Sequence, residues 1–352
     1  MHDEEFYSGK KILVTGNTGF KGSWLCAMLI LAGAQVTGYS LKPPTNPNLY
    51  EILKLQQSME TVLGDVRDYE LLAKTMQEKK PEIVIHLAAQ PLVRESYIRV
   101  RETFDTNVMG SVNLLESVRH CSSVRSVLNV TTDKVYENKE WCWGYREHDT
   151  LNGYDPYSNS KSCSELVTQS FRKSFFEGSG VAVSTARAGN VIGGGDFAPD
   201  RIIPDCVRAA SEGKKIMVRN PYSVRPYQHV LEALSAYLLI VRKQYEDLQL
   251  QGEYNVGPEE SSCVTTGELV GMFCDKWQEG LQWETRTECN PMHEANFLRL
   301  DCSKIKGRLG WNCTWGIEES LEAAVIWSKE WLYHPENIGA LTRKQIEAFR
   351  KS

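Results

Sequence analysis

A glycine-rich loop close to the N-terminus constrains the fold of this chain more than any other feature. The apolar run 11–15 (KILVT) leads directly into Gly16, Gly19 and Gly22, and a segment typical of a helix follows over 22–32. In such a strand–loop–helix unit one glycine makes the tight turn, one lets the backbone approach a pyrophosphate, and one lets the helix pack on the strand. The GxxGxxG spacing differs from GxGxxG, but these physical requirements are the same. The loop therefore indicates a dinucleotide-binding βα unit.

Short apolar runs alternate with longer amphipathic segments through the first half of the chain. Strands are predicted over 11–15, 35–39, 83–87, 126–130 and 181–186, and helices over 22–32, 69–79, 107–119 and 158–175. Alternating strands and helices favour a parallel sheet that is covered on both faces. The sequence therefore predicts an α/β fold with a Rossmann-like doubly wound parallel sheet.

Prolines and glycines interrupt this pattern after about residue 189, where only short pieces such as 203–212 and 318–332 read as helices. We predict a dinucleotide-binding domain over 8–189, to which 228–256 returns. Residues 190–227 and 257–336 would form a smaller, partly interleaved C-terminal α/β lobe, and 337–352 a helical tail. The lobe is expected over the carboxyl ends of the strands, where ligands bind in open α/β sheets.

Composition excludes several classes of protein. The 352 residues carry a net charge of −5, which gives no bulk attraction to nucleic acid. No run approaches the ~18 apolar residues of a membrane span, and the polar, acidic start of the chain does not resemble a signal peptide. The ten cysteines include no CxxC pair and no zinc-ligand spacing. We expect reduced thiols, no metal and a cytoplasmic location.

The residues that would read the cofactor ribose leave NAD and NADP open. The end of the second predicted strand carries no acidic residue; Ser40 can bond a ribose hydroxyl, and Lys42 either favours a 2′-phosphate or is a solvated loop charge. Asp65 follows a further predicted strand and is placed to bond an adenine amine.

Tyr157 and Lys161 form a YxxxK pair at the start of a predicted helix, so both lie on one helical face. An ammonium beside the phenol stabilises the phenolate and is expected to lower the tyrosine pKa toward neutrality, which makes a usable base. Thr132, Asp133 and Lys134 follow the strand 126–130, so these polar groups end a strand beside the expected cofactor.

The order of these motifs resembles the extended short-chain dehydrogenase/reductase superfamily, and in particular its sugar-nucleotide 4,6-dehydratases. Within them the chain is most similar to the enzymes that act on CDP-glucose. The stretches that carry this resemblance are VTGNTGFKGSWL, HLAAQPLVRESY, TTDKVYENKEWCWGYRE, GYDPYSNSKSCSELV, RAGNVIGGGDFAPDRIIPD, RNPYSVRPYQHVLE and LDCSKIKGRLGW. The glycine loop and YxxxK mark the superfamily only, whereas TDK with the following YENKEWCWGYRE is more discriminating.

The resemblance implies an internal redox cycle in which NAD takes a hydride from C4 of glucose, water leaves across C5 and C6, and the hydride returns to C6. It implies that Tyr157 is the C4 base, that Lys161 tunes it and holds the nicotinamide ribose, and that Thr132 bonds O4. Asp133 would protonate the leaving C6 hydroxyl. Lys134 stands where the dTDP-glucose relatives have a glutamate, and it is either the C5 base, if its pKa is depressed, or an electrostatic or water-positioning group.

The remaining site residues also come from the resemblance. Cofactor contacts are expected from Gly16, Thr18, Gly19, Phe20, Lys21, Gly22, Ser40, Asp65, Val66, Ala88, Ala89, Gln90 and Asn107, besides Tyr157 and Lys161. Contacts to the nucleotide sugar are expected from Arg94, Ser96, Asn190, Arg201, Arg225 and His293. The two arginines of the C-terminal lobe suit a pyrophosphate, whereas His293 can equally be a structural helix-end histidine.

Three alternatives remain beside this interpretation. A dehydratase for GDP-mannose, dTDP-glucose or UDP-glucose would share the motifs, and a 4-epimerase would need no acid such as Asp133. A non-catalytic dinucleotide sensor would need neither Tyr157 nor Lys161.

The helices 107–119 and 158–175 resemble the pair that forms a four-helix dimer interface in this superfamily, so a homodimer, or a tetramer built from two dimers, is expected.

Overall fold

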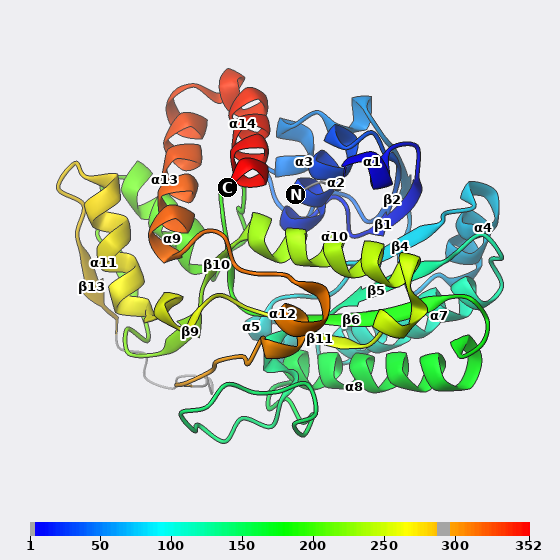
Figure 1. Ribbon diagram of the computed structural model, residues 1–352. Helices are drawn as coiled ribbons and strands as arrows, with labels where there is room; N and C mark the ends of the chain where they lie inside the picture. The colour runs from blue at the N-terminus through cyan, green and yellow to red at the C-terminus, as the bar shows by residue number, and fades with distance from the viewer. Residues whose placement is uncertain (1–3, 287–295) are drawn as a thin grey trace.

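The structure, a computed structural model, describes residues 4–286 and 296–352. Seven parallel strands form its central sheet (Figure 1). Their spatial order is β11 (Glu253–Val256), β6 (Ala182–Ala188), β5 (Ser126–Val130), β4 (Ile83–His86), β1 (Lys11–Thr15), β2 (Gln35–Ser40) and β3 (Glu60–Leu63). The chain reverses its direction of winding between β1 and β4, and ligands of doubly wound sheets bind at such a point. The predicted α/β class and the parallel sheet are confirmed.

Helices cover both faces of the sheet because successive residues of each buried strand point to opposite sides. Ile12 and Val14 pack in one apolar cluster with α2 (Phe20–Leu31) and α10 (Val230–Glu246), whereas Leu13 packs in another on the opposite face. That second face carries α4 (Tyr69–Lys79), α7 (Gly110–Arg119) and α8 (Pro156–Phe171). In Figure 1, α10 lies on one side of the strands and α8 on the other.

Residues after β6 form a smaller body beside the carboxyl ends of the strands. Its elements are β7 (Val191–Ile192), α9 (Ile202–Ser211), β8 (Ile216–Val218), β9 (Val224–Pro226), β10 (Gln228–His229), β12 (Cys263–Thr265), α11 (Thr266–Trp277), β13 (Trp283–Thr285) and α13 (Ile317–Tyr333). Three two-stranded ribbons pair β8 with β13, β9 with β12 and β7 with β10. An apolar cluster that includes Phe273, Trp277 and Leu321 holds α11 and α13 against this body.

The chain returns from this body to the sheet twice. β11 pairs with β6 at the edge of the sheet, after α10 has crossed its face. The last helix, α14 (Ile338–Lys351), packs Phe349 against Trp315 and donates from Arg350 to the carbonyl of Met28 in α2. The division into lobes at the predicted residues stays a prediction, since these crossings join both bodies.

The remaining helices are short connections: α1 (Glu4–Tyr7), α3 (Leu49–Ile52), α5 (Val93–Ile98), α6 (Val100–Phe104) and α12 (Ser303–Leu309). Two predicted helices differ in detail. The segment before α7 is a π-helical turn over Asp105–Met109, and α8 ends in another over Arg172–Phe176. Within the described ranges, no helix is long and apolar enough to cross a membrane.

Candidate active site

A cavity of about 1060 Å³ lies where the carboxyl ends of the central strands meet the smaller body. Its walls bring together residues that are far apart in the sequence. They include Lys21, Arg94, Thr132, Asp133, Lys134, Tyr157, Asn190, Arg201 and Arg225. The catalytic residues predicted from the TDK and YxxxK motifs, except the more deeply set Lys161, therefore line one cavity together with four of the predicted substrate contacts.

Thr132 shapes the turn that follows β5. Its side chain accepts the backbone N–H of Lys134 at 3.4 Å and donates to Oδ1 of Asp133 at 2.9 Å. These bonds aim the side chain of Asp133 into the cavity wall while Lys134 stays partly exposed.

Asp133 is a buried carboxyl in the wall of the cavity. Its side chain is buried, and burial raises the pKa of its carboxyl, although the positive charges of Lys134 and Arg225 act in the opposite direction. Its second oxygen, Oδ2, has no hydrogen-bond partner among the described residues. A carboxyl whose protonated form is favoured and whose second oxygen is unpartnered can donate a proton to a bound group.

The start of α8 fixes the YxxxK pair. Asp155 caps the helix by accepting the N–H of Ser158 at 3.0 Å, and Pro156 occupies the first turn. Lys161 donates from Nζ to the carbonyl of Val130, the last residue of β5, at 3.1 Å. Burial lowers the pKa of Lys161 to about 8. The Lys161 side chain thus joins α8 to the end of β5.

Tyr157 departs from the expected pKa. Burial raises its pKa to about 12 and outweighs the hydrogen bond with Thr132 and the positive charge of Arg201, both of which lower it. The prediction that the pKa of Tyr157 lies near neutrality was therefore wrong for the protein without bound ligands. The spacing of tyrosine and lysine in the sequence does not indicate how deeply the phenol is buried.

Lys21 belongs to the same cavity. It is the second residue of α2, and its Nζ lies 3.5 Å from the hydroxyl of Tyr237 on α10. Burial, together with the nearby Arg201, lowers its pKa to about 8, while Asp133 acts in the opposite direction. Lys21 and Asp133 thus line the same cavity, close enough for their charges to act on each other.

The glycine loop has the close backbone packing that a dinucleotide cradle needs. Gly16 has a positive φ of 73°, and a Cβ there would come within 2.7 Å of the backbone nitrogen of Ala88 at the end of β4. A Cβ on Gly22 would overlap the carbonyl oxygen of Gly16. Both glycines are therefore required for the loop to approach β4 and to lie flat on the start of α2.

The second strand contributes to the same region. The hydroxyls of Thr18 and Ser40 lie 2.7 Å apart, which places the end of β2 beside the glycine loop. Lys42 is exposed. Nη2 of Arg67 lies 2.6 Å from Oδ2 of Asp65, and the hydrogen bonds from Arg67 lower the pKa of the Asp65 carboxyl.

Two predicted ligand contacts also support neighbouring segments. Asn107 is buried; its Oδ1 accepts the N–H of Gln90 at 2.8 Å, and its Nδ2 donates to Ser160 at 2.9 Å. The side chain of Ser96 is not among those that line the cavity, and its hydroxyl accepts the N–H of Tyr157 at 3.1 Å. Both side chains hold the strand-end loop and α8, because polar groups buried beside a site need partners of their own. Their contacts to cofactor and substrate stay predictions.

The substrate side of the cavity is cationic. Arg201 pairs with Asp196 at 2.9 Å, Arg225 is buried and donates to the carbonyl of Val224 at 3.0 Å, and Arg94 lies 3.9 Å from Asp200. Asn190 completes this wall. His293 falls in 287–295, outside the described residues.

Sequence reasoning missed Asp196, which lines the cavity, and Tyr237, whose hydroxyl lies 3.5 Å from Nζ of Lys21. Asp196 directly follows the glycines 193–195, a position that could have marked it as the partner of Arg201. Tyr237 lies within the apolar helix α10, and nothing in its sequence surroundings distinguishes it from a core tyrosine.

Comparison with known proteins fits this geometry. Residues 13–324 match the profile of the GDP-mannose 4,6 dehydratase family. The chain belongs to this family of sugar-nucleotide 4,6-dehydratases. It is similar to a CDP-glucose 4,6-dehydratase of Salmonella typhimurium, with 48% identity over 94% of each chain.

Solved structures of the wider superfamily share the fold of this dehydratase family member. A Bacillus anthracis dTDP-glucose 4,6-dehydratase in complex with NAD superposes with a TM-score of 0.78 at 24% identity, covering 92% of this chain and 97% of the other. A Thermotoga maritima UDP-glucose 4-epimerase superposes with a TM-score of 0.79 at 22% identity, covering 91% and 99%.

Proposed function

We propose that the chain converts CDP-glucose to CDP-4-keto-6-deoxyglucose with bound NAD. The observation that carries the substrate is the 48% identity to a CDP-glucose 4,6-dehydratase over 94% of both chains. The cavity supports the reaction type, because the buried carboxyl of Asp133 and the phenol of Tyr157 both line it, as an acid and a base of this reaction would. An epimerase has no use for such an acid.

The glycine loop and its surroundings fit NAD. Gly16, Gly19 and Gly22 would approach its pyrophosphate at the start of α2, with Ser40 beside its ribose and Ala88 and Ala89 against it from the end of β4. When bound, NAD would supply the hydride acceptor for C4 and the hydride donor for C6.

Oxidation at C4 falls to residues of α8 and the β5 turn. The phenolate form of Tyr157 takes the proton of the C4 hydroxyl and becomes the phenol, and the Lys161 ammonium stabilises that phenolate before the transfer. Thr132, which hydrogen-bonds Tyr157, holds the phenol and the hydroxyl in line. The high pKa of Tyr157 in the cavity makes this electrostatic help necessary.

Elimination falls to Asp133 and Lys134. The C4 ketone acidifies the C5 proton, which passes to a water molecule beside Lys134, while Asp133 gives its proton to the leaving C6 hydroxyl. The later return of hydride to C6 is balanced by the return of a proton to C5. We assign Lys134 to electrostatic stabilisation of the enolate, since its positive charge already acts on the Asp133 carboxyl beside it. Arg201 and Arg225 would hold the pyrophosphate of the substrate, with Arg94 and Asn190 on the same wall.

Product formation from CDP-glucose, dTDP-glucose, UDP-glucose and GDP-mannose, each with added NAD⁺, tests this proposal. We expect the alkaline absorbance of a 4-keto-6-deoxy sugar from CDP-glucose and little from the others. A signal from another nucleotide alone would keep the reaction and replace the substrate. A product with an inverted C4 and an intact C6 hydroxyl would identify an epimerase, and no reaction with any of them would favour a dinucleotide sensor.

Replacing Gly22 by alanine should weaken NAD binding by about tenfold or more, because the added methyl would push the loop away from α2. Isothermal titration with NAD⁺ measures this directly. Gly271→Ala is the matched control, since this glycine also lies in a helix but has open space around its Cβ position. Equal affinity in both variants would contradict the assigned cradle.

We further propose a homodimer built on α7 and α8, with location in the cytoplasm. Apolar side chains are exposed on α8, at Leu166, and on the π-helical turns that adjoin α7 and α8, at Met109 and Phe175. The nine cysteines described in the structure are unpaired, which suits a reducing compartment.

Leu166→Asp should weaken this dimer by about 100-fold, because a carboxylate would be buried without a partner at the interface. Leu166 is 53% exposed in the single chain. Sedimentation equilibrium of the wild type and the variant gives the two dissociation constants. Ile326→Asp, at a similarly exposed position on α13, is the control and should leave the dimer intact. A wild type that is monomeric at micromolar concentration would defeat the proposed interface.

A further inference from the structure

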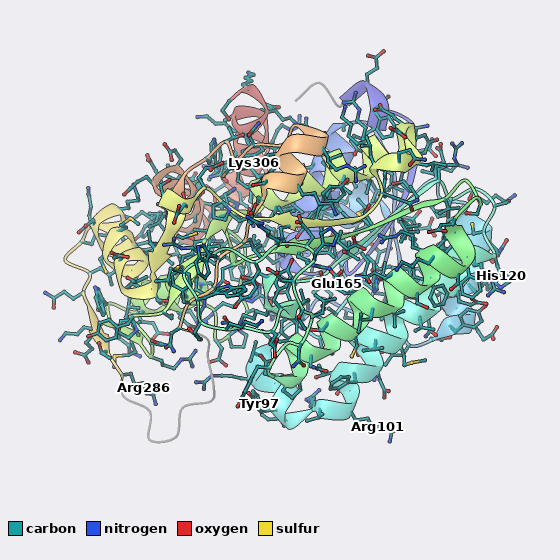
Figure 2. The ribbon with its side chains drawn as sticks, turned by 60° about the horizontal axis from the view of Figure 1, so that its bottom comes forward. Tyr97, Arg101, His120, Glu165, Arg286 and Lys306 are labelled. Carbon is teal, nitrogen blue, oxygen red and sulfur yellow. The ribbon has the colours of Figure 1, made fainter. Side chains whose placement is uncertain are left out.

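A buried ion pair lies directly beneath the catalytic cavity. Nη2 of Arg187, on β6, lies 2.8 Å from Oε2 of Glu165, on α8, and both side chains are 0% exposed. Glu165 lies on the side of α8 that faces the interior (Figure 2). Charges withdrawn from water are costly unless they are paired and hydrogen-bonded, so the arrangement around them must be well defined.

The Glu165 carboxylate is held by two residues of β6 and by the residue that directly follows β5. Its Oε1 accepts the hydroxyl of Thr131 at 2.5 Å, and its Oε2 accepts the hydroxyl of Thr185 at 2.8 Å besides Arg187. Arg187 in turn donates from Nη1 to the hydroxyl of Tyr136 at 2.9 Å, whose own proton goes to Asn255 on β11. This network spans β5, β6 and β11 and meets α8 at Glu165.

The network touches the catalytic residues at two neighbouring points. Glu165 lies four residues after Lys161, one turn further along α8. Thr131, which Glu165 binds, directly precedes Thr132 and directly follows Val130, whose carbonyl accepts the Lys161 ammonium. Glu165 and Lys161, both on α8, therefore bind two consecutive residues at the end of β5, Thr131 and Val130.

The charge of Glu165 also acts on Lys161. Burial lowers the pKa of Lys161, and Glu165 raises it. Among the described residues, Glu165 is the negative charge that acts on this ammonium. Lys21, on α2, is a second cation, and His86, on β4, is neutral because burial lowers its pKa to about 3. Tyr157, on the same helix, is protonated at rest because its pKa is raised.

We propose that Glu165 is a positioning residue for Lys161: anchored by Arg187, Thr131 and Thr185, it fixes α8 against the Thr132–Lys134 turn and keeps the ammonium protonated. This inference rests on the proposed function, since it assigns the work of Lys161 to the C4 oxidation. It explains why a chain with a large apolar core keeps a buried ion pair at this place.

Glu165→Gln removes the charge and keeps the shape, and Glu165→Asp keeps the charge. Because Glu165→Gln leaves Arg187 unpaired, the double variant Glu165→Gln with Arg187→Gln removes both charges and secures a folded protein. Competitive labelling of Lys161 with acetic anhydride, read by peptide mass spectrometry at each pH, reports its titration without substrate. We expect the midpoint to fall by about one pH unit in both glutamine variants and to stay near the wild-type value in Glu165→Asp.

Turnover of CDP-glucose across the same pH range gives the second readout. In the glutamine variants kcat should fall by about twofold at pH 7 and by about tenfold at pH 9, because neutral Lys161 no longer stabilises the Tyr157 phenolate. A loss that is equal at every pH, with an unchanged Lys161 titration, would show a merely structural pair and overturn the inference. A shifted titration in a protein that does not turn over CDP-glucose supports the placement of Glu165 and overturns the proposed function instead.

Discussion

Tyr157→Phe should lower the turnover of CDP-glucose by about 10³-fold, within the range that removal of a general base produces. The variant loses only a hydroxyl, so the aromatic ring still fills its place at the start of α8. The C4 hydroxyl then has no acceptor for its proton, and neither oxidation nor the later steps proceed. The effect is expected in kcat, because the cradle for the cofactor and the arginines for the substrate are untouched.

Two measurements separate a lost base from a damaged fold. NAD⁺ affinity by titration should stay within about threefold of the wild type, while product formation disappears. Tyr97→Phe is the control: this tyrosine lies on α5, near the cavity but outside its lining (Figure 2). A Tyr157→Phe protein that retains more than a tenth of wild-type turnover would remove Tyr157 from the role of base.

The pH dependence of the wild type follows from the same pair. The rate should rise with pH at first, because the phenolate of Tyr157 is the active form and its pKa is raised to about 12. It should fall again above about pH 8, where Lys161 loses the proton that stabilises this phenolate.

Helices and strands could be predicted from the sequence wherever the hydrophobic periodicity of a segment and its length indicated the same element. β1, α4 and β5 begin and end at the predicted residues, because each is a short buried run or an amphipathic helix between turn signals. The two π-helical turns, at Asp105–Met109 and Arg172–Phe176, were not predicted, since they continue the apolar pattern of the helices they adjoin.

Side-chain roles were harder to predict than positions. Asn107 and Ser96 follow motifs that meet the site, yet both spend their hydrogen bonds on the backbone of Gln90 and Tyr157. A polar residue beside a site can hold the surrounding backbone as well as contact a ligand, and the structure shows its hydrogen-bond partners where the sequence does not. The pKa of Tyr157 depends on burial in the same way.

The sequence contains a signal for the ion pair of Glu165 and Arg187 that the sequence analysis did not use. Each is a charged residue in an otherwise buried segment, one in SCSELV and the other in AVSTARA. Opposite charges on two elements that must both be buried imply a pair between them. What the sequence lacks is the distance between α8 and β6, which the sheet topology alone supplies.

Asp133→Asn should separate the two halves of the reaction, with overall dehydration reduced by about 10²- to 10⁴-fold. Asparagine matches the carboxyl in shape and still accepts from Thr132, but it has no proton to give to the leaving C6 hydroxyl. Since Tyr157 and Lys161 are intact, C4 oxidation continues, and the reduced nicotinamide accumulates. The near-ultraviolet absorbance of bound NADH after addition of CDP-glucose should therefore grow in this variant and remain flat in Tyr157→Phe.

The pH profile gives this prediction a second test. Burial raises the pKa of Asp133, so its acid form is retained to higher pH than for an exposed carboxyl, and the elimination slows as pH rises through that pKa. In Asp133→Asn the rate of elimination should no longer change with pH in this range.

Asp200→Asn is the control, because Asp200 lines the same cavity at its exposed rim and pairs with Arg219. This variant should change the KM for CDP-glucose and leave the ratio of oxidation to elimination unchanged. If Asp133→Asn forms product without accumulation of reduced nicotinamide, the proton reaches the leaving hydroxyl from another group, and Lys21, which faces Asp133 with a pKa of about 8, becomes the candidate donor.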